Sequence, residues 1–380
     1  MTQFSHLAER EDLFQQKHCG CLRKSTDLEH DKRTPDSRDS CRSEFDRGQA
    51  MLGPKWSGHR PSSQKRTVLA RSRHRRASWC NTMSALDVTD SMTRSRPADV
   101  RTNSLADVGL QRADGCGRLV LSGSVNGTRI EDVFERSPTR IMFPRTGHCG
   151  VGEAVIINTG GGVAGGDRLE CCVTALPGAS IAVTSQAAEK IYRALHEPAS
   201  IATRLIARES KLAWLPQETI VFNWARLHRT TEIELFSGAE LLALEWLVLG
   251  RAAHGEIVVG GNITDSWRVK KDGRLIWADS FRVTDEIFPQ LNRKALLSNC
   301  KAIATLIYFG PDLDKRLEFL REILLSLECG CAVTVVSGLI VARFAAKQSS
   351  DLKLALRSFL QQFGPEIGSG PFRVPKMWSC

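Results

Sequence analysis

The chain has 380 residues, of which 42% are hydrophobic and 25% charged, and its formal net charge at pH 7 is +10. This composition is typical of a globular protein, and the length allows two or three domains. No apolar run reaches the ~18 residues that a membrane-spanning helix needs. No signal peptide opens the chain either, so we expect a cytoplasmic protein.

The first hundred residues differ in composition from the rest. They hold 19 Lys+Arg and 13 Asp+Glu, and residues 55–76 contain eight basic residues and no acid. Polar residues dominate and no helical or strand period is sustained, so residues 1–106 are predicted to be a basic, disordered extension. A basic run of this kind can bind nucleic acid through phosphate contacts. Because aromatic residues are not interleaved with it, we favour a solvated tail.

From Gly115 onward the chain consists of short strand-like runs separated by turn residues. The runs are residues 117–122, 127–130, 140–144, 155–158, 180–184, 199–206, 211–215, 232–236, 240–246 and 266–269. Pro-Gly, Ser-Gly and Asp-Gly pairs punctuate them, which favours stacked antiparallel sheets over alternating β–α units. The fold class predicted for residues 107–380 is therefore mostly β, with stacked short-strand sheets.

Two stretches late in the chain are predicted to be helical. Leucine and isoleucine recur at three- and four-residue spacing from Asp312 to Leu327, with Asp312 as a candidate N-cap. The second helix is expected to open at Ser350 or Asp351 and to end at Gly364-Pro365. Between the helices, residues 332–344 read as strand on both sides of Gly338. Both helices thus fall in the C-terminal half.

A glycine-rich segment, Gly160 to Gly166, lies between two apolar runs. Gly160, Gly162 and Gly165 fit the G-x-G-x-x-G spacing, which raises the alternative of a nucleotide-binding enzyme using this loop. That function requires a helix that begins at the glycines and receives the pyrophosphate. Residues 167–176 are short and β-leaning instead, so we expect a turn between two strands.

The twelve cysteines show no paired C-x-x-C spacing of a structural zinc site. Cys171 and Cys172 are adjacent, and Cys329-Gly-Cys331 forms a C-x-C. In a reducing compartment most of them are expected to be small, buried apolar residues. A soft-metal site at Cys329 and Cys331 is the less favoured alternative.

Five motifs together resemble the UreD (UreH) family of urease accessory proteins. They are residues 158–169, 184–193, 214–222, 242–256 and 373–378, and the resemblance runs from about Gly117 to Trp378. It implies a mostly-β, β-helix-like stack of sheets with two helices. It also implies a chaperone-like protein, not an enzyme, that binds apo-urease with UreF and UreG and helps to deliver nickel, and it allows a homodimer within that complex. No permanent cofactor is expected, only transient Ni²⁺.

The chain departs from the family pattern at three motif positions and at its N-terminus. Ala164, Glu189 and Trp224 stand where we expect other residue types, and the first hundred residues have no counterpart in the family core. The residues at positions 189 and 224 are therefore expected to bear on local metal contacts more than on the fold.

Acids inside the matched motifs are the candidate nickel contacts. Nickel in transit must be released again, and carboxylates, waters and carbonyls hold it less tightly than a closed cage of thiolates or imidazoles. The candidates are Asp167, Glu218, Glu245, His254 and Glu256. Two alternatives stay open: an ion pair of Glu245 with Arg251 or Arg226, and a turn-capping role for Asp167. No G-x-S-x-G or H-E-x-x-H motif is present, so the sequence favours binding or delivery over catalysis.

Overall fold

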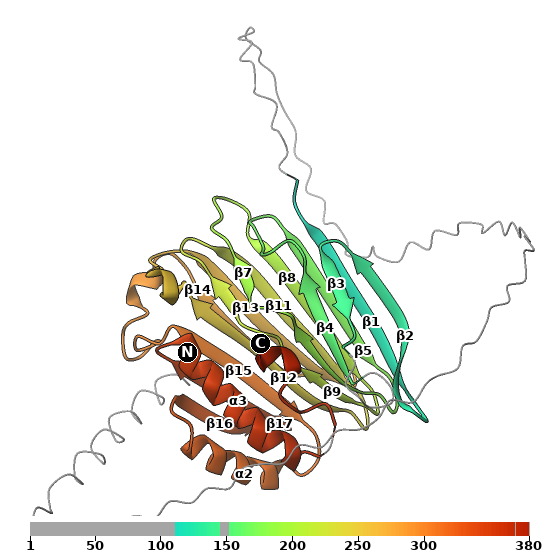
Figure 1. The fold of residues 1–380 in the computed structure, drawn as a ribbon. Coiled ribbons are helices and arrows are strands. Elements are labelled where there is room, and N and C mark those ends of the chain that lie inside the picture. Colours follow the sequence, from blue (N-terminus) through green and yellow to red (C-terminus); the bar gives the residue numbers. More distant parts are fainter. Residues whose placement is uncertain (1–110, 145–151, 369, 380) are drawn as a thin grey trace, which may run out of the picture. The chain divides into compact units, whose positions relative to one another are not determined.

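The computed structural model describes residues 111–144, 152–368 and 370–379 (Figure 1). The predicted basic extension, residues 1–106, and its basic run, residues 55–76, lie outside the described residues. No helix in the described part is long and apolar enough to cross a membrane.

The first sheet has seven strands in the order β14-β13-β11-β8-β5-β1-β2. Its central strands run parallel, and the antiparallel strands β2 and β14 form the edges. The strands are β1 (Asp114–Ser124), β2 (Gly127–Arg136), β5 (Arg168–Ala175), β8 (Ala199–Ala207), β11 (Arg226–Leu235), β13 (Asn262–Lys271) and β14 (Arg274–Val283).

The second sheet follows the order β16-β17-β15-β12-β9-β6-β4-β3, with β7 and β10 joined at one side through β12. The pairs β4–β6, β6–β9 and β9–β12 are parallel, and the outer pairs are antiparallel. The strands are β3 (Thr139–Met142), β4 (Glu153–Asn158), β6 (Ser180–Ser185), β7 (Glu189–Ile191), β9 (Lys211–Trp214), β10 (Thr219–Val221), β12 (Glu240–Leu249), β15 (Ala302–Phe309), β16 (Gly330–Val336) and β17 (Leu339–Ala346).

Between β5 and β12 the chain crosses repeatedly from one sheet to the other, and the short strands β7 and β10 follow β6 and β9 within the second sheet. The chain passes from β5 to β6, from β8 to β9 and from β11 to β12, and each step moves from the first sheet to the second. This winding confirms the mostly-β, β-helix-like stack. The prediction of antiparallel pairing is wrong for its centre, because turns such as Pro177-Gly178 and Ser237-Gly238 lead the chain into the opposite sheet, where a hairpin would have kept it in the same one.

Two helices cover the β15–β17 side of the second sheet (Figure 1). They are α2 (Leu313–Leu325) and α3 (Ser349–Glu366), and the predicted stripe of α3 is buried at Leu352, Leu356, Phe359, Leu360 and Phe363. Phe359 meets Phe344 of β17 edge to face, with 5.4 Å between ring centroids. Every residue of β12 is buried because this strand lies between the first sheet and the helical layer.

The helix ends differ from the prediction in two details. Asp312 has a left-handed backbone, φ 54°, and its side chain makes no capping hydrogen bond. Helix α3 begins at Ser349 and continues through Pro365 to Glu366. A proline in the last turn removes only one hydrogen bond from the helical ladder, so the packed stripe can carry the helix past it.

The glycine segment is a turn between strands, as expected. Strand β4 ends at Asn158 and β5 begins at Arg168, with no helix between them. The Tyr192 hydroxyl donates to Gly161 O at 3.0 Å, and a Cβ atom at Gly162 would lie 2.5 Å from the Tyr192 ring. The dinucleotide-binding interpretation is therefore wrong, because the glycines let the loop close over an aromatic ring.

Candidate functional site

A cavity of about 190 Å³ lies between the sheets, next to the glycine turn. Its wall includes residues from both sheets, and at this volume it has room for several water molecules. The polar side chains that matter below are Asn158, Glu189, Gln217, Thr219, Arg229 and Glu245, together with Cys171 and Trp214. A cavity of this volume between two packed sheets is unusual, because side chains normally fill a protein interior.

Two members of a buried charged triad, Arg229 and Glu245, line part of this cavity. Arg229 of β11 binds Asp265 of β13 with two hydrogen bonds, Nε to Oδ1 at 2.9 Å and Nη2 to Oδ2 at 2.7 Å. Its third nitrogen, Nη1, donates to Glu245 Oε2 at 2.8 Å and to Thr219 Oγ1 at 2.9 Å. The side chains of Arg229 and Glu245 are only 2% and 5% exposed. The guanidinium is therefore shared between two carboxylates.

Strand alternation explains why the arginine points inward. In β11 the inward positions are Leu227, Arg229, Thr231, Ile233 and Leu235, so the charge replaces an apolar residue in an otherwise regular pattern. The parallel register of β11 and β13 places Arg229 opposite Asp265. The pair is therefore fixed by backbone hydrogen bonds on neighbouring strands.

The two carboxylates of the triad compete for one positive charge. Burial raises the pKa of Glu245, Arg229 counteracts this, and the charge of Asp265 adds to the increase. Trp214 Nε1 donates to Glu245 Oε1 at 2.8 Å and stabilises the ionised form. With both acids ionised, the triad carries one net negative charge in a site sheltered from bulk water.

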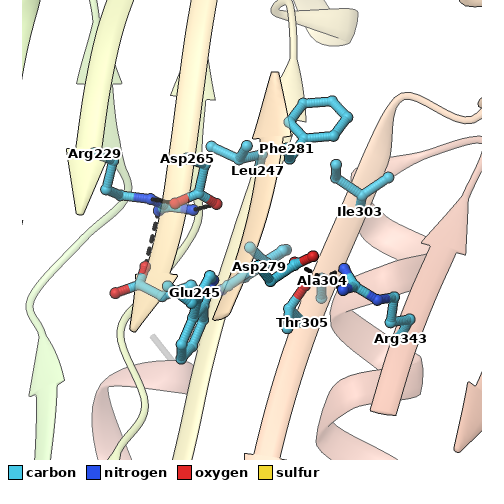
Figure 2. Close-up of a pocket in the computed structure, with 12 residues that line it drawn as sticks. Arg229, Glu245, Leu247, Asp265, Asp279, Phe281, Ile303, Ala304, Thr305 and Arg343 are labelled. Atoms are coloured by element: carbon cyan, nitrogen blue, oxygen red, sulfur yellow. Dashed lines mark hydrogen bonds and ion pairs between the residues drawn. The ribbon is translucent and has the colours of Figure 1, made fainter. Parts of the chain in front are cut away.

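A second, smaller cavity of about 20 Å³ also touches the triad (Figure 2). Arg229, Glu245 and Asp265 line it, as does a second ion pair, Arg343 Nη2 to Asp279 Oδ2 at 2.7 Å. This volume holds roughly one or two water molecules. Because Arg229 and Glu245 border both cavities, their ion pair lies between the larger and the smaller space.

Two further side chains on the wall of the larger cavity, Glu189 and Gln217, carry oxygens that could ligate a cation. The Glu189 carboxylate accepts from Asn158 Nδ2 at 3.0 Å, and burial raises its pKa to about 7. Gln217 Nε2 donates to Met377 O at 2.7 Å, while Gln217 Oε1 is buried and has no hydrogen-bond partner among the described residues. A buried acceptor without a donor is costly, so this oxygen is suited to a water or a cation.

Glu189 is expected to make the protein less stable above neutral pH. A carboxyl with a raised folded-state pKa binds more protons folded than unfolded between pH 4.5 and about 7, so the free energy of unfolding falls as the pH rises through this range. Glu189→Gln removes this loss. The variant should be more stable than wild type by about 1–3 kcal/mol at pH 8 and no more stable near pH 4. Urea unfolding at both pH values measures the difference, and an equal gain at both would contradict the assignment.

The comparison with known proteins identifies the family of this chain. Residues 113–379 match the family described as UreD urease accessory protein. The chain belongs to the UreD family. A urease accessory protein UreD of Xanthobacter autotrophicus is 40% identical over 288 residues, which cover 75% of this chain and 97% of that protein. The UreD of Rhizobium johnstonii is 38% identical over 273 residues, 71% and 96% of the two chains. UreD 1 of Brucella ovis is 36% identical over 283 residues, 74% and 99%.

The structure of this UreD-family chain brings one of the five predicted metal contacts into the cavity. Glu245 lines it, whereas Asp167 closes the glycine turn by accepting from Ala113 N at 2.8 Å and Ala164 N at 2.7 Å. Glu218 Oε2 is buried without a hydrogen-bond partner among the described residues, but Glu218 does not line the cavity. The turn-capping alternative for Asp167 is thus what the geometry shows.

The other two predicted contacts lie in a surface loop. His254 is exposed in the short helix η1 (Ala252–His254). Glu256 is bound by Arg251 Nε at 2.9 Å, and this hydrogen bond lowers the pKa of Glu256. Within residues 111–144, 152–368 and 370–379, no group of three or more His, Cys, Asp or Glu has the arrangement of a metal site. The nickel-binding roles of the five residues stay predictions.

Glu245 lies in the interior, but the ion-pair partners predicted for it are wrong. Its ion pair is with Arg229, not with Arg251 or Arg226. Arg229, Asp265 and Gln217 were missed altogether. The one available signal was Arg229 at an apolar position of the β11 alternation, and alternation alone does not show what a charge in that position meets.

Among the described cysteines, one lines the cavity and two lie near the start of β16 at the edge of the second sheet. Cys171 lines the cavity, and burial raises the pKa of its thiol to about 12. Cys329 and Cys331, at the start of β16, are joined by a thiol hydrogen bond that, together with burial, raises the pKa of Cys329. Both environments favour the protonated thiol over the thiolate that binds metals.

Proposed function

We propose that this chain is a urease maturation factor that joins UreF, UreG and apo-urease and conducts Ni²⁺ through its inter-sheet cavity. The single observation that carries the proposal is a cavity inside a UreD-family fold whose wall includes the carboxylates of Glu170, Glu189 and Glu245. The relatives are named as urease accessory proteins, which supports work on urease itself. A homodimer within the complex belongs to the same proposal.

The donors of the cavity suit a metal ion that must leave again. Glu189 and Glu245 offer carboxylate oxygens, and Gln217 Oε1 offers a neutral amide oxygen. Oxygen donors of this kind bind Ni²⁺ less tightly than thiolates or imidazoles, and the remaining coordination positions can stay filled by water. Nickel is therefore cargo in this proposal, and the chain acts as a binding and delivery protein without chemistry of its own.

Urease activation in cells tests this function. The urease subunits, UreF and UreG are co-expressed with and without the chain, and urease activity and nickel content are measured. We expect activity to require the chain, and the double variant Glu189→Gln/Glu245→Gln to lose at least about ten-fold in activation, the usual scale for losing donors to a metal. The variant should still co-purify with UreF and apo-urease, because both side chains lie inside the stack.

Asp132→Asn provides the matched control. This carboxylate is 50% exposed on the edge strand β2, where it pairs with Arg118, and it should have no effect on activation. Full urease activity in cells that lack the chain would contradict the maturation role. Full activity with the double variant would contradict the cavity as the route of the metal.

A further inference from the structure

In the charged triad of Arg229, Asp265 and Glu245, the two carboxylates are bound unequally. Arg229 holds Asp265 through two parallel hydrogen bonds, but it holds Glu245 through one. Bidentate arginine–carboxylate pairs are stronger and geometrically more exact than single contacts. Glu245 is therefore the partner that Arg229 can release at the lower cost.

Charge balance gives the same direction. The charges of Arg229 and Asp265 balance each other without Glu245, so Glu245, when ionised, adds the one negative charge of the triad that is not compensated. A buried carboxylate in this position is strongly attracted to any further cation that reaches it. The guanidinium Nη1 would keep its bond to Thr219 Oγ1 at 2.9 Å after releasing Glu245.

The volumes of the two cavities indicate that a cation would reach Glu245 from the larger one. The space of about 190 Å³ accommodates an ion with part of its water shell, whereas the space of about 20 Å³ accommodates roughly one or two waters. A pair that served only to pack the sheets would be surrounded by filled volume, since buried charges are weak contributors to stability. Here the pair stands where the packing is incomplete on both sides.

We propose that Glu245 is an exchange position, at which a divalent cation from the larger cavity displaces the Arg229 guanidinium. In this exchange the Glu245 Oε2–Arg229 Nη1 hydrogen bond breaks, a bond from Oε2 to the cation forms, and one water leaves the cation for the cavity. Glu245 Oε1 keeps its hydrogen bond from Trp214, which holds the carboxylate in place. Arg229 thus acts as a built-in cation that closes the position until a metal ion takes it over.

The proposal rests on the proposed function but is tested without urease. Nickel binding to the purified full-length chain is measured by equilibrium dialysis with elemental analysis at pH 7.5. Glu245→Gln is expected to lose one nickel ion per chain, or to weaken that ion by about 10–100-fold. Arg229→Gln, which removes the competing charge, should bind the same ion at least about ten-fold more tightly than wild type. Adding Glu245→Gln to Arg229→Gln should abolish the gain.

Glu234→Gln is the matched control, because Glu234 also belongs to a strand ion pair but faces away from the core, toward Arg204. It should bind nickel as wild type does. Where Arg229→Gln does not fold, Arg229→Met/Asp265→Leu is judged by the same expectation, because it removes the guanidinium together with its bidentate partner. Glu245→Gln keeps the shape of the side chain and one acceptor oxygen, so it can retain the hydrogen bond from either Trp214 or Arg229, and it tests the carboxylate without either arginine variant.

Unchanged nickel binding by Glu245→Gln, or a gain with Arg229→Gln that survives the loss of Glu245, would overturn the exchange position. Its failure is distinct from failure of the maturation role. A chain that binds nickel at Glu245 but is dispensable for urease activation would refute the function and leave the exchange position standing. A chain required for activation whose nickel binding ignores Glu245 would do the reverse.

Discussion

Asp265→Ala is expected to lower the free energy of unfolding by about 3–5 kcal/mol, the largest effect of any single polar substitution considered for this fold. The change removes the acceptors of Arg229 Nε and Nη2, and the arginine is only 2% exposed. A buried guanidinium that keeps one carboxylate has lost half of its hydrogen bonds. Urea unfolding at pH 7, with the midpoint compared at constant slope, measures the loss.

An exposed ion pair supplies the control for Asp265→Ala. Asp132→Ala breaks the Arg118–Asp132 pair on β2, whose side chains are about half exposed, and should cost about 0–1 kcal/mol. The triple variant Arg229→Met/Glu245→Gln/Asp265→Leu should recover most of the stability, because it removes the buried charges together and keeps an acceptor for Trp214. Equal losses for Asp265→Ala and Asp132→Ala would show that the triad is solvated and not buried.

The strands and helices of the fold could be located from the sequence, but the parallel pairing of the central strands could not be predicted. Alternation and turn residues located most of the strands, and the leucine stripes located both helices within a few residues. A turn such as Pro177-Gly178 looks the same whether the next strand pairs beside the previous one or crosses to another sheet. The parallel winding is decided by which faces bury their apolar residues together, which is a tertiary property.

The candidate site shows the same limit. Glu245 stood out because an acid inside an entirely apolar run must meet a partner, and that inference needs no structure. Its partner could not be chosen, because arginines occur at residues 226, 229 and 251, and only the packing of β11 in the first sheet against β12 in the second selects Arg229. Asp265 lies in β13, which mixes polar and apolar residues. In such a strand the sequence does not show which alternate positions face the core, so an inward-facing acid cannot be told from an outward-facing one.

The glycine segment carried two interpretations because its spacing fits a phosphate loop and a turn alike. The deciding difference was the following segment, which forms β5 instead of a helix. The atoms that approach Gly162 belong to the ring of Tyr192, more than twenty positions later in the chain. The reason for a glycine at this position therefore lies outside any local motif. Motif spacing thus constrains the backbone, while the group that approaches it must come from the fold.

Trp378→Ala is expected to destabilise the protein by about 3–5 kcal/mol and to weaken nickel binding in the cavity. The indole is 1% exposed, lies 5.9 Å from the ring of Trp246, and donates from Nε1 to Leu215 O at 3.0 Å. Removing it leaves a void in the core, while Leu215 O keeps its hydrogen bond from Thr184 Oγ1 at 2.6 Å. The neighbouring residue matters as well, since Met377 O holds the Gln217 amide against the cavity wall at 2.7 Å.

Thermal unfolding and nickel dialysis together test this coupling between the C-terminal segment and the cavity. Leu354→Ala, at a position of α3 that is 66% exposed, should change neither property and is the control. Trp378→Phe keeps most of the ring contact but loses the hydrogen bond to Leu215, so it should cost about 1–3 kcal/mol and leave nickel binding closer to wild type. If Trp378→Ala unfolds like wild type, the segment is not part of the core. If it is destabilised but binds nickel normally, the position of Gln217 does not depend on the packing of Trp378, and the cavity wall is held by the sheets alone.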